Sequence, residues 1–240
     1  MKKTRKGTLI TLALAGLLAI PTTVHARTIE FSGYQWEVRP SGIGGPGPNN
    51  WDENNVSVDS HGYLHMKLTQ RDGEWYCSEV YLPQSFGFGF YQFSVIGRVD
   101  ALDPNVVLGL FNYLGPDGAN EIDIEFAHWG DPLSPIDNYT VYPAQVGTRP
   151  ATRSFPFRLS GVGNSTHAFN WTSTSVLFQS FRGANVNPSV SWLFQPRDPQ
   201  SRIPQIPLPV HINLWLFQGQ APLNGQDVEL IIRAFTFTPM

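Results

Sequence analysis

The chain has 240 residues, of which 41% are hydrophobic, 13% are aromatic and only 15% are charged, and its formal net charge at pH 7 is −3. Soluble domains usually carry about 25% charged residues, and 22 glycines and 20 prolines do not suit a helical bundle or a coiled coil. A disordered chain is also excluded, because this aromatic content can bury enough apolar surface to offset the entropy of ordering.

The first 26 residues have the pattern of a secretory signal peptide. Basic residues at positions 2, 3, 5 and 6 precede an apolar segment at 9–20, and Val24-His25-Ala26 provides small residues at the usual cleavage spacing. The apolar segment is shorter than the ~20 residues that span a bilayer. We therefore expect cleavage near Ala26, export to the periplasm or the medium without a membrane anchor, and a single domain over residues 27–240.

Removal of this segment makes the chain more acidic. Residues 1–26 hold four of the 16 basic residues and none of the 19 acidic ones, which leaves 12 basic and 19 acidic residues and a net charge of −7. An acidic chain without a Lys/Arg cluster is a poor ligand for nucleic acid or anionic membranes. Cys77 has no second Cys to pair with, so we expect it to be buried and free. We also expect a monomer.

Short segments with hydrophobic residues at alternate positions recur along the rest of the chain. Several such segments, separated by Gly- and Pro-rich turns, predict an all-β sandwich or barrel. Two further segments, 41–50 and 196–209, are rich in Gly or Pro and are expected to be long loops, which often border binding sites. In chain order, the predicted strands cover residues 63–68, 88–96, 106–114, 121–126, 138–146, 176–181, 210–217 and 228–237.

The segment 120–126 (NEIDIEF) alternates acidic and apolar residues. Successive side chains of a strand point to opposite faces, so Glu121, Asp123 and Glu125 form a row on one face. Three carboxylates in one row repel each other, and acidic residues are poor strand formers. Folding alone does not explain the row, which favours a functional reason.

Three alternatives could account for such a row without catalysis: a solvated strand face, a Ca²⁺ site, and protection of a sheet edge. Ca²⁺ takes about 6–8 oxygen ligands, more than a straight row supplies, and the apolar opposite face indicates a strand within a packed sheet. Glycoside hydrolysis instead needs two carboxyl groups that flank the scissile bond. Glu121 and Glu125 lie about 13 Å apart at Cα. This spacing allows both the retaining separation of ~5.5 Å and the inverting separation of ~6.5–9.5 Å between carboxyl groups.

Glu-Ile-Asp-Ile-Glu at 121–125 resembles the signature of glycoside hydrolase family 16, which includes bacterial β-1,3-1,4-glucanases, laminarinases, agarases, κ-carrageenases and xyloglucan transglycosylases. The resemblance runs from about Trp51 to the C-terminus, through residues 77–79 (CSE), 86–91 (FGFGFY), 110–116 (LFNYLGP), 167–171 (HAFNW) and 212–215 (INLW).

The resemblance implies a β-jelly roll of two antiparallel sheets with a concave substrate cleft, and a retaining double displacement. By position in the motif, Glu121 would be the nucleophile, Asp123 the assisting carboxylate and Glu125 the general acid/base. No cofactor is required. Some members carry a structural Ca²⁺, and the sequence does not locate such a site here.

The resemblance also implies sugar contacts outside the acidic strand. Aromatic rings pack on the apolar faces of sugars, and amides and carboxylates bond their hydroxyls. Trp129, just after the acidic strand, is a further candidate for the cleft wall, Trp171 is predicted to be core, and Trp36, Trp51, Trp75 and Trp192 receive no assignment. The implied contact residues are Glu79, Phe111, Tyr113, Asn213 and Trp215.

Three departures from the family pattern leave the substrate open. Ala119-Asn120 replaces an aromatic residue that is usual in bacterial lichenases, Tyr81 replaces a frequent Arg, and Cys77 lacks the disulfide partner seen in some members. We therefore expect a secreted, retaining endo-β-glycanase that hydrolyses β-1,3- or mixed β-1,3-1,4-glucan. The alternatives are a transglycosylase, a galactan hydrolase, or a non-catalytic carbohydrate-binding jelly roll.

Overall fold

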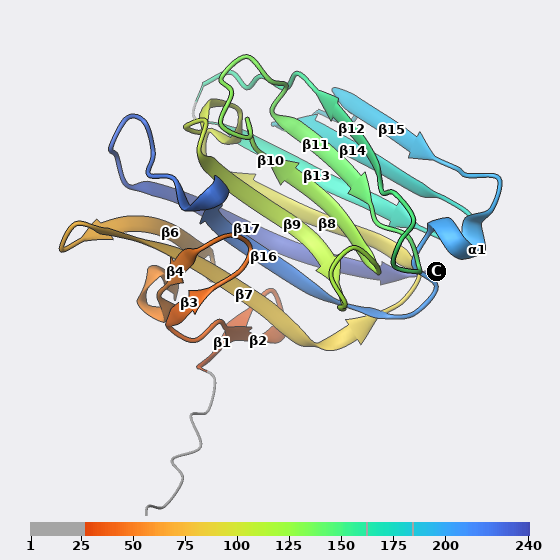
Figure 1. Ribbon diagram of the computed structural model, residues 1–240, viewed down its shortest axis with the longest axis horizontal. Helices are drawn as coiled ribbons and strands as arrows, with labels where there is room; N and C mark the ends of the chain where they lie inside the picture. The colour runs from red at the N-terminus through yellow and green to blue at the C-terminus, as the bar shows by residue number, and fades with distance from the viewer. Residues whose placement is uncertain (1–26, 162, 184) are drawn as a thin grey trace, which may run out of the picture.

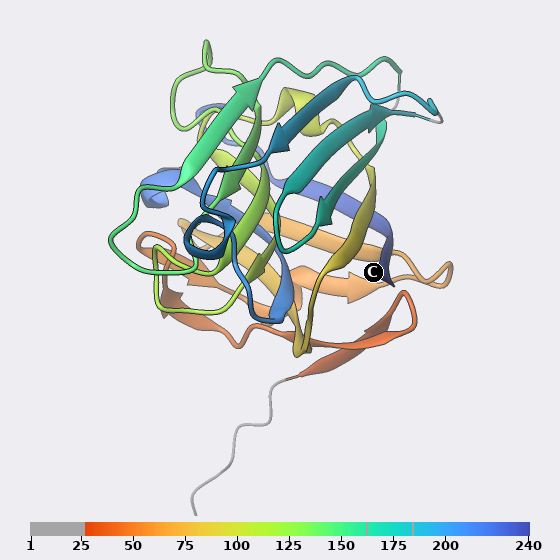
Figure 2. The ribbon, with the colours of Figure 1, turned by 90° about the vertical axis from the view of Figure 1, so that its right-hand side faces the viewer.

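The computed structural model describes residues 27–161, 163–183 and 185–240, so the predicted signal peptide lies outside the described residues. In the described residues, 17 strands form one continuous hydrogen-bonded arrangement, which folds over through a hairpin so that two antiparallel sheets pack face to face as a β-jelly roll (Figure 1), as predicted. In the side view of Figure 2, the green strands of one sheet lie to the left of the teal strands of the other.

We call the first sheet the cleft sheet, because its outer face carries the site described below. Its strands, in spatial order, are β12 (Ala151–Phe155), β11 (Asp137–Val141), β10 (Glu121–Phe126), β9 (Val106–Tyr113), β16 (Leu208–Leu216), β7 (Glu74–Phe86), β2 (Tyr34–Val38) and β1 (Thr28–Phe31).

The second sheet is called the back sheet. Its strands, in spatial order, are β15 (Val190–Phe194), β14 (Val176–Arg182), β13 (Asn164–Trp171), β8 (Gly89–Ile96), β17 (Val228–Pro239), β6 (Leu64–Arg71) and β5 (Val56–Val58). The remaining elements are β3 (Gly42–Gly44), β4 (Asn49–Trp51), the short helix α1 (Pro199–Arg202) and three 3-10 turns, η1 (Glu53–Asn55), η2 (Val99–Ala101) and η3 (Phe217–Gly219).

The core lies between the sheets and follows the alternation in the sequence. In β8 and β14 every second side chain is buried, and in β10 Ile122, Ile124 and Phe126 point into the core. Trp171 is fully buried, as predicted, and its indole N–H donates to the carbonyl of Pro204 at 3.0 Å. Cys77 is also buried and free. The opposite face of β10 is therefore the one that carries the carboxylates.

Some predicted boundaries are wrong. The expected loop 41–50 contains β3 and the start of β4, and the expected loop 196–209 contains α1 and the start of β16. The predicted strand 138–146 ends at Val141. The long strand β7 escaped prediction because residues 77–80 are buried on both faces and show no alternation. No helix among the described residues is long and apolar enough to cross a membrane.

Candidate active site

A cavity of ≈ 570 Å³ opens on the outer face of the cleft sheet. The structure brings all the predicted site residues together in its wall. They are Glu79, Phe111, Tyr113, Glu121, Asp123, Glu125, Trp129, Asn213 and Trp215. Their order in the chain spans 137 positions, from 79 to 215, and strand pairing is what gathers them.

Strand register places these side chains in rows across β10, β9, β16 and β7. Glu125 pairs with Gly109, which pairs with Asn213, which in turn pairs with Glu79. Paired residues in a sheet point to the same face, and adjacent strands lie about 4.8 Å apart. This first row therefore runs from Glu125 at one side of the cavity to Glu79 at the other.

A second row lies one step further along the strands. Asp123 pairs with Phe111, Phe111 with His211, and His211 with Tyr81. The third carboxylate, Glu121, pairs with Tyr113. The acidic strand thus faces two aromatic side chains on its immediate neighbour.

Gly109 leaves room for the Asn213 side chain to lie over it. A Cβ atom at this position would lie 2.4 Å from the Asn213 Oδ1 atom, closer than any packed contact. Asn213 Oδ1 and Asp123 Oδ1 are buried, and neither has a hydrogen-bond partner among the described residues. Unsatisfied buried acceptors are costly, so both atoms are suited to a ligand that donates hydrogen bonds.

Burial raises the pKa values of all three carboxyl groups of β10. It raises the pKa of Glu121 to about 7. Burial, together with the charge of Glu121, raises the pKa of Glu125 to about 8. Burial and the charges of both glutamates raise the pKa of Asp123, which is 3% exposed. At neutral pH the row therefore carries fewer than three negative charges and holds ionised and protonated carboxyl groups side by side.

On the far side of the cavity, Glu79 is held ionised. Burial alone would raise its pKa, but a hydrogen bond and charge from His211 and the charge of Arg39 outweigh burial and lower it. The Arg39 guanidinium donates to Glu79 Oε2 at 2.7 Å, and His211 Nδ1 lies 3.0 Å from Oε1. Arg39 itself stacks on Trp51, 3.9 Å from the ring centroid. This arrangement leaves a fixed, negatively charged acceptor in the wall.

Aromatic side chains border the cavity at two places. Phe111 and His211 are stacked, with ring centroids 5.0 Å apart. Trp129 lies 6.3 Å from Trp215 and 5.5 Å from Phe217, again between centroids. Such surfaces are suited to pack against the C–H faces of sugar rings.

The backbone on both sides of β10 has an unusual conformation. Asn120 precedes the strand with φ 54°, and Trp129 follows it with φ 55°. Asn tolerates this left-handed region, whereas a bulky residue such as Trp seldom adopts it. Strained residues of this kind gather at functional sites. Here the residue in question, Trp129, lines the cavity.

Sequence reasoning missed four polar residues of the wall, namely Arg39, Asp117, Tyr142 and His211. A signal for His211 was present, because it is in phase with Asn213 and Trp215 along one strand. Asp117 lies in the loop before β10 and accepts a 2.6 Å hydrogen bond from the Tyr113 hydroxyl. Arg39 and Tyr142 lie just after the ends of strands, and nothing in the neighbouring sequence indicates that they line the cavity.

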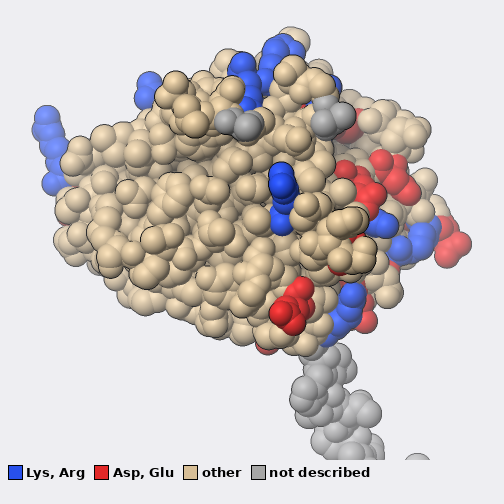
Figure 3. All heavy atoms as spheres, turned by 180° about the vertical axis from the view of Figure 1, so that it is seen from behind, with Lys and Arg blue, Asp and Glu red and all other residues tan. Residues whose placement is uncertain are grey.

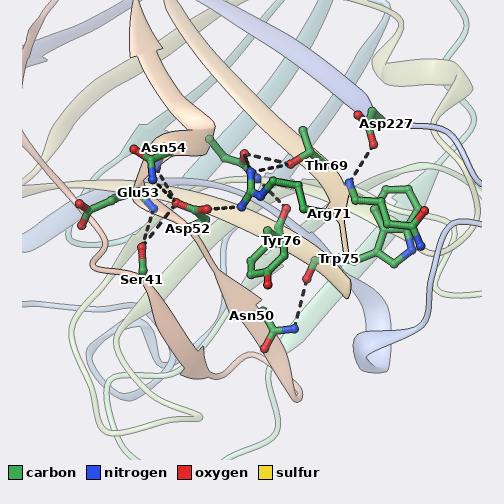
Figure 4. Close-up of polar contacts among 12 residues, drawn as sticks. Ser41, Asn50, Asp52, Glu53, Asn54, Thr69, Arg71, Trp75, Tyr76 and Asp227 are labelled. Carbon is green, nitrogen blue, oxygen red and sulfur yellow. Dashed lines mark hydrogen bonds and ion pairs between the residues drawn. The ribbon is translucent and has the colours of Figure 1, made fainter. Parts of the chain in front are cut away.

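Gly45 and Pro46, in the turn between β3 and β4, line the cavity. Polar contacts join the segment around β4 to β6 and β7 (Figure 4). Asp52, just after β4, forms an ion pair with Arg71 and accepts a 2.7 Å hydrogen bond from the Asn54 backbone. The Arg71 guanidinium lies 4.3 Å from the ring centroid of Tyr76. These contacts fix β3 and β4 against the β6–β7 hairpin.

The cavity contains carboxyl, amide, imidazole and aromatic groups, and these can bind a polyol and exchange protons with it. In the described part of the chain, no group of three or more His, Cys, Asp and Glu side chains is arranged to hold a metal ion. The carboxyl groups of β10 are the ones in this wall whose pKa values burial raises into the neutral range or upward, which suits them to exchange protons with a ligand.

No protein-family model matches the sequence. The search of curated proteins likewise finds no match. Solved structures do match the fold. A β-glucanase from Bacillus licheniformis is 23% identical with a TM-score of 0.65, over 91% of this chain and 100% of the other. A β-1,3-1,4-glucanase (lichenase) from a mouse hindgut metagenome is 20% identical with a TM-score of 0.62, over 85% and 93%.

A third structure has a different description. It is an immunostimulatory antigen and pseudo β-1,3-glucanase of Mycobacterium tuberculosis, 18% identical with a TM-score of 0.63, over 82% of this chain and 88% of the other. At these identities the comparisons establish that the chain has the jelly-roll fold of these proteins. The chemistry that this chain can perform therefore has to be inferred from the residues of its site.

Proposed function

We propose that the protein is a secreted glycoside hydrolase that cleaves β-1,3- or mixed β-1,3-1,4-glucan within the polymer and retains the anomeric configuration. One observation carries the proposal: three carboxyl groups with raised pKa values share one strand face and open into a cavity bordered by aromatic rings. The fold shared with a β-glucanase and a lichenase supports glucan as the substrate.

In the first step, the Glu121 carboxylate attacks the anomeric carbon while Glu125 gives its proton to the leaving glycosidic oxygen. The C–O bond of the linkage breaks, and a glycosyl ester of Glu121 forms. Burial favours the protonated form of Glu125, which an acid requires, and the pKa of Glu121 leaves part of it ionised at neutral pH. Asp123, between them, holds Glu121 in place.

In the second step, Glu125 takes a proton from a water molecule, whose oxygen attacks the anomeric carbon and releases the sugar from Glu121. The carboxyl groups return to their starting protonation states, so the cycle balances without a cofactor. Glu79 and Asn213 accept hydrogen bonds from sugar hydroxyls, and Phe111, Tyr113, Trp129 and Trp215 pack on sugar rings.

The test is the release of reducing ends from a panel of soluble β-1,3-glucan, mixed-linkage β-glucan and galactan. We expect hydrolysis of a glucan by the wild-type protein. Glu121→Gln should lower turnover by ~10³-fold or more, because an amide is a poor nucleophile. The matched control is Glu74→Gln, an exposed residue of β7, which should retain full activity.

The fold shared with a pseudo β-1,3-glucanase makes non-catalytic binding the competing function. It predicts that the wild-type protein binds polymer and releases no reducing ends. That result, or full activity of Glu121→Gln, would overturn the proposed function.

A further inference from the structure

The middle of the outer face of the back sheet, formed by β8, β13 and β14, presents no Lys, Arg, Asp or Glu side chain, whereas Lys67, Glu229 and Arg233 lie on the outer side of β6 and β17. Figure 3, which views the molecule from behind, shows a broad area with few Lys, Arg, Asp or Glu side chains; Asp and Glu gather toward the right and lower edges, and Lys and Arg stand along the upper edge, at the left edge and singly near the centre. Protein surfaces ordinarily carry about 25–35% charged residues of mixed sign. In a chain that becomes acidic without residues 1–26, an uncharged face of this size requires a separate explanation.

Six side chains define this back face: Phe90, Gln92 and Ser94 of β8, Thr166 of β13, and Gln179 and Phe181 of β14. They alternate with buried residues along each strand and are themselves partly exposed. Their side chains therefore point away from the core. They provide two aromatic rings, two amides and two hydroxyls, and no charge.

The register places five of these side chains in two adjacent rows, and Phe90 lies in the row beyond, opposite Asn170. Gln92 and Gln179 lie in one row, on either side of Ala168. Ser94, Thr166 and Phe181 lie in the next row. Rows on one sheet face are about 7 Å apart along the strand, and neighbouring strands are about 4.8 Å apart. The amides, hydroxyls and the Phe181 ring thus form one continuous surface.

This surface is hollowed where its side chains are small. A pocket of ≈ 180 Å³ lies at Ser94 and Thr166, and its lining also includes Asn164 and Arg233. A β-bulge between Ile232 and Ala234 accounts for Arg233, because the extra residue of a bulge re-aims a side chain. Hydroxyl, amide and guanidinium groups thus surround a depression beside Phe181.

We propose that the back face is a second binding surface for the neutral polysaccharide, separate from the cleft. A polyol presents hydroxyls that amides and hydroxyls can bond and C–H faces that Phe90 and Phe181 can pack against, and it brings no charge that would have to be desolvated. The absence of a Lys/Arg cluster disfavours nucleic acid and anionic lipid. The identity of the polymer rests on the proposed function.

A second binding surface on the same molecule changes how tightly the protein binds a polymer that also occupies the cleft. A chain held on the back sheet keeps further segments at high local concentration, which raises the overall affinity without a new contact in the cleft. Short oligosaccharides, which can occupy only the cleft, gain nothing from it. This difference between polymer and oligosaccharide provides the test.

The test uses the full chain with Glu121→Gln, so that polymer survives the measurement. Gln92→Glu/Gln179→Glu adds two charges to the back face at partly exposed positions, and Gln200→Glu/Gln226→Glu adds two charges at exposed positions elsewhere as the control. Retention in native gels that contain soluble β-1,3-glucan, mixed-linkage β-glucan or galactan gives the Kd. We expect the back-face pair to raise the Kd about tenfold and the control to leave it unchanged. With Glu121 restored, the pair should keep the parent kcat/KM on a short aryl oligosaccharide.

Two results would overturn the proposal: retention equal to that of the control, or no retention of the parent protein on any of the polymers. A dimer that dissociates with the back-face pair in size-exclusion chromatography would instead show that a second copy covers this face. If retention depends on the back face but the wild-type protein releases no reducing ends, the proposed hydrolase function fails while the second surface stands.

Discussion

Two neighbouring strands, β10 and β11, each carry a cluster of ionisable groups, but on opposite faces of the cleft sheet. The carboxyl groups of β10 open into the cavity. On β11, Asp137 and Tyr139 point between the sheets, where the Tyr139 hydroxyl donates to Asp137 Oδ2 at 3.0 Å. Ser180 of the back sheet continues this core cluster, 2.7 Å from the Tyr139 hydroxyl and 2.9 Å from His167 Nδ1.

In both clusters, burial favours the uncharged form of the ionisable groups. It raises the pKa of Asp137 to about 7, as it does for Glu121, and it lowers the pKa of His167 to about 3. Yet neither Asp137 nor His167 lines the cavity. A shifted pKa therefore does not identify a site by itself. What distinguishes β10 is that several carboxyl groups converge on space that a ligand can enter.

The largest expected effect is that of Glu125→Gln on activity. The amide cannot protonate the leaving oxygen, so hydrolysis of polymer should fall by ~10²–10⁴-fold. An aryl glycoside with a good leaving group needs no such proton, and its first step should be nearly unaffected. The initial rate on polymer and the burst of aryl alcohol release, which reports the first step alone, measure the difference, because the second step still requires Glu125 as the base. An equal loss on both would show that Glu125 is not the acid.

The same variant tests the pH dependence. In the wild-type protein Glu121 must be ionised and Glu125 protonated. The rate should therefore rise with pH through about 7 and fall as pH rises through about 8, although the pair titrates jointly. Glu125→Gln should abolish the alkaline fall, because the group that deprotonates is gone.

The core cluster should control stability instead of activity. The folded pKa of Asp137, about 7, lies above its ordinary value of 3.8. Between these two pH values the unfolded chain gives up a proton that the folded protein keeps. The contribution of this group to the free energy of unfolding is therefore complete below pH 3.8 and is lost as pH rises through about 7, by up to ~4 kcal/mol.

Asp137→Asn should remove this dependence. Urea unfolding at pH 5 and pH 8 gives the free energy of unfolding of the variant, of the wild type and of the control Asp72→Asn, which alters an exposed turn residue. We expect the wild type and the control to lose stability at pH 8 relative to Asp137→Asn, and kcat to be similar in all three. Parallel pH dependence in all three proteins would contradict the role of burial at Asp137.

The acidic strand and its cleft-facing side could be predicted from the sequence because a strand imposes a period of two. Glu121, Asp123 and Glu125 alternate with Ile122 and Ile124, and the structure places them as the alternation requires. The core position of Trp171 was predicted because a large aromatic side chain is more often packed in a core than exposed, and this residue is fully buried. Local rules suffice where one strand alone decides which face a residue occupies.

Arg39 and Asp137 could not be predicted, for two different reasons. Arg39 reaches Glu79, 40 positions away, because β2 pairs with β7, and such long-range pairing leaves no local signal. Asp137 begins a strand that is buried on both faces. From the sequence alone, an acidic residue at this position is expected to lie in an exposed loop. The back face likewise emerges only when several strands lie side by side.

The smallest expected effects come from two histidines: His211, which lines the cavity, and His167, which lies in the core cluster. His211→Phe keeps a ring stacked between Phe111 and Tyr81 but loses the contact with Glu79, so KM should rise ~3–10-fold with little change in kcat or stability. His167→Phe leaves the buried Ser165 hydroxyl without its partner and Ser180 with Tyr139 alone, which should cost ~1–3 kcal/mol of stability and leave KM unchanged. Steady-state kinetics and urea unfolding of both variants would separate these effects. Because the cleft residues and the core cluster lie on opposite faces of the cleft sheet, the two variants should act independently. A rise in KM for His167→Phe, or a loss of stability without a rise in KM for His211→Phe, would contradict this independence.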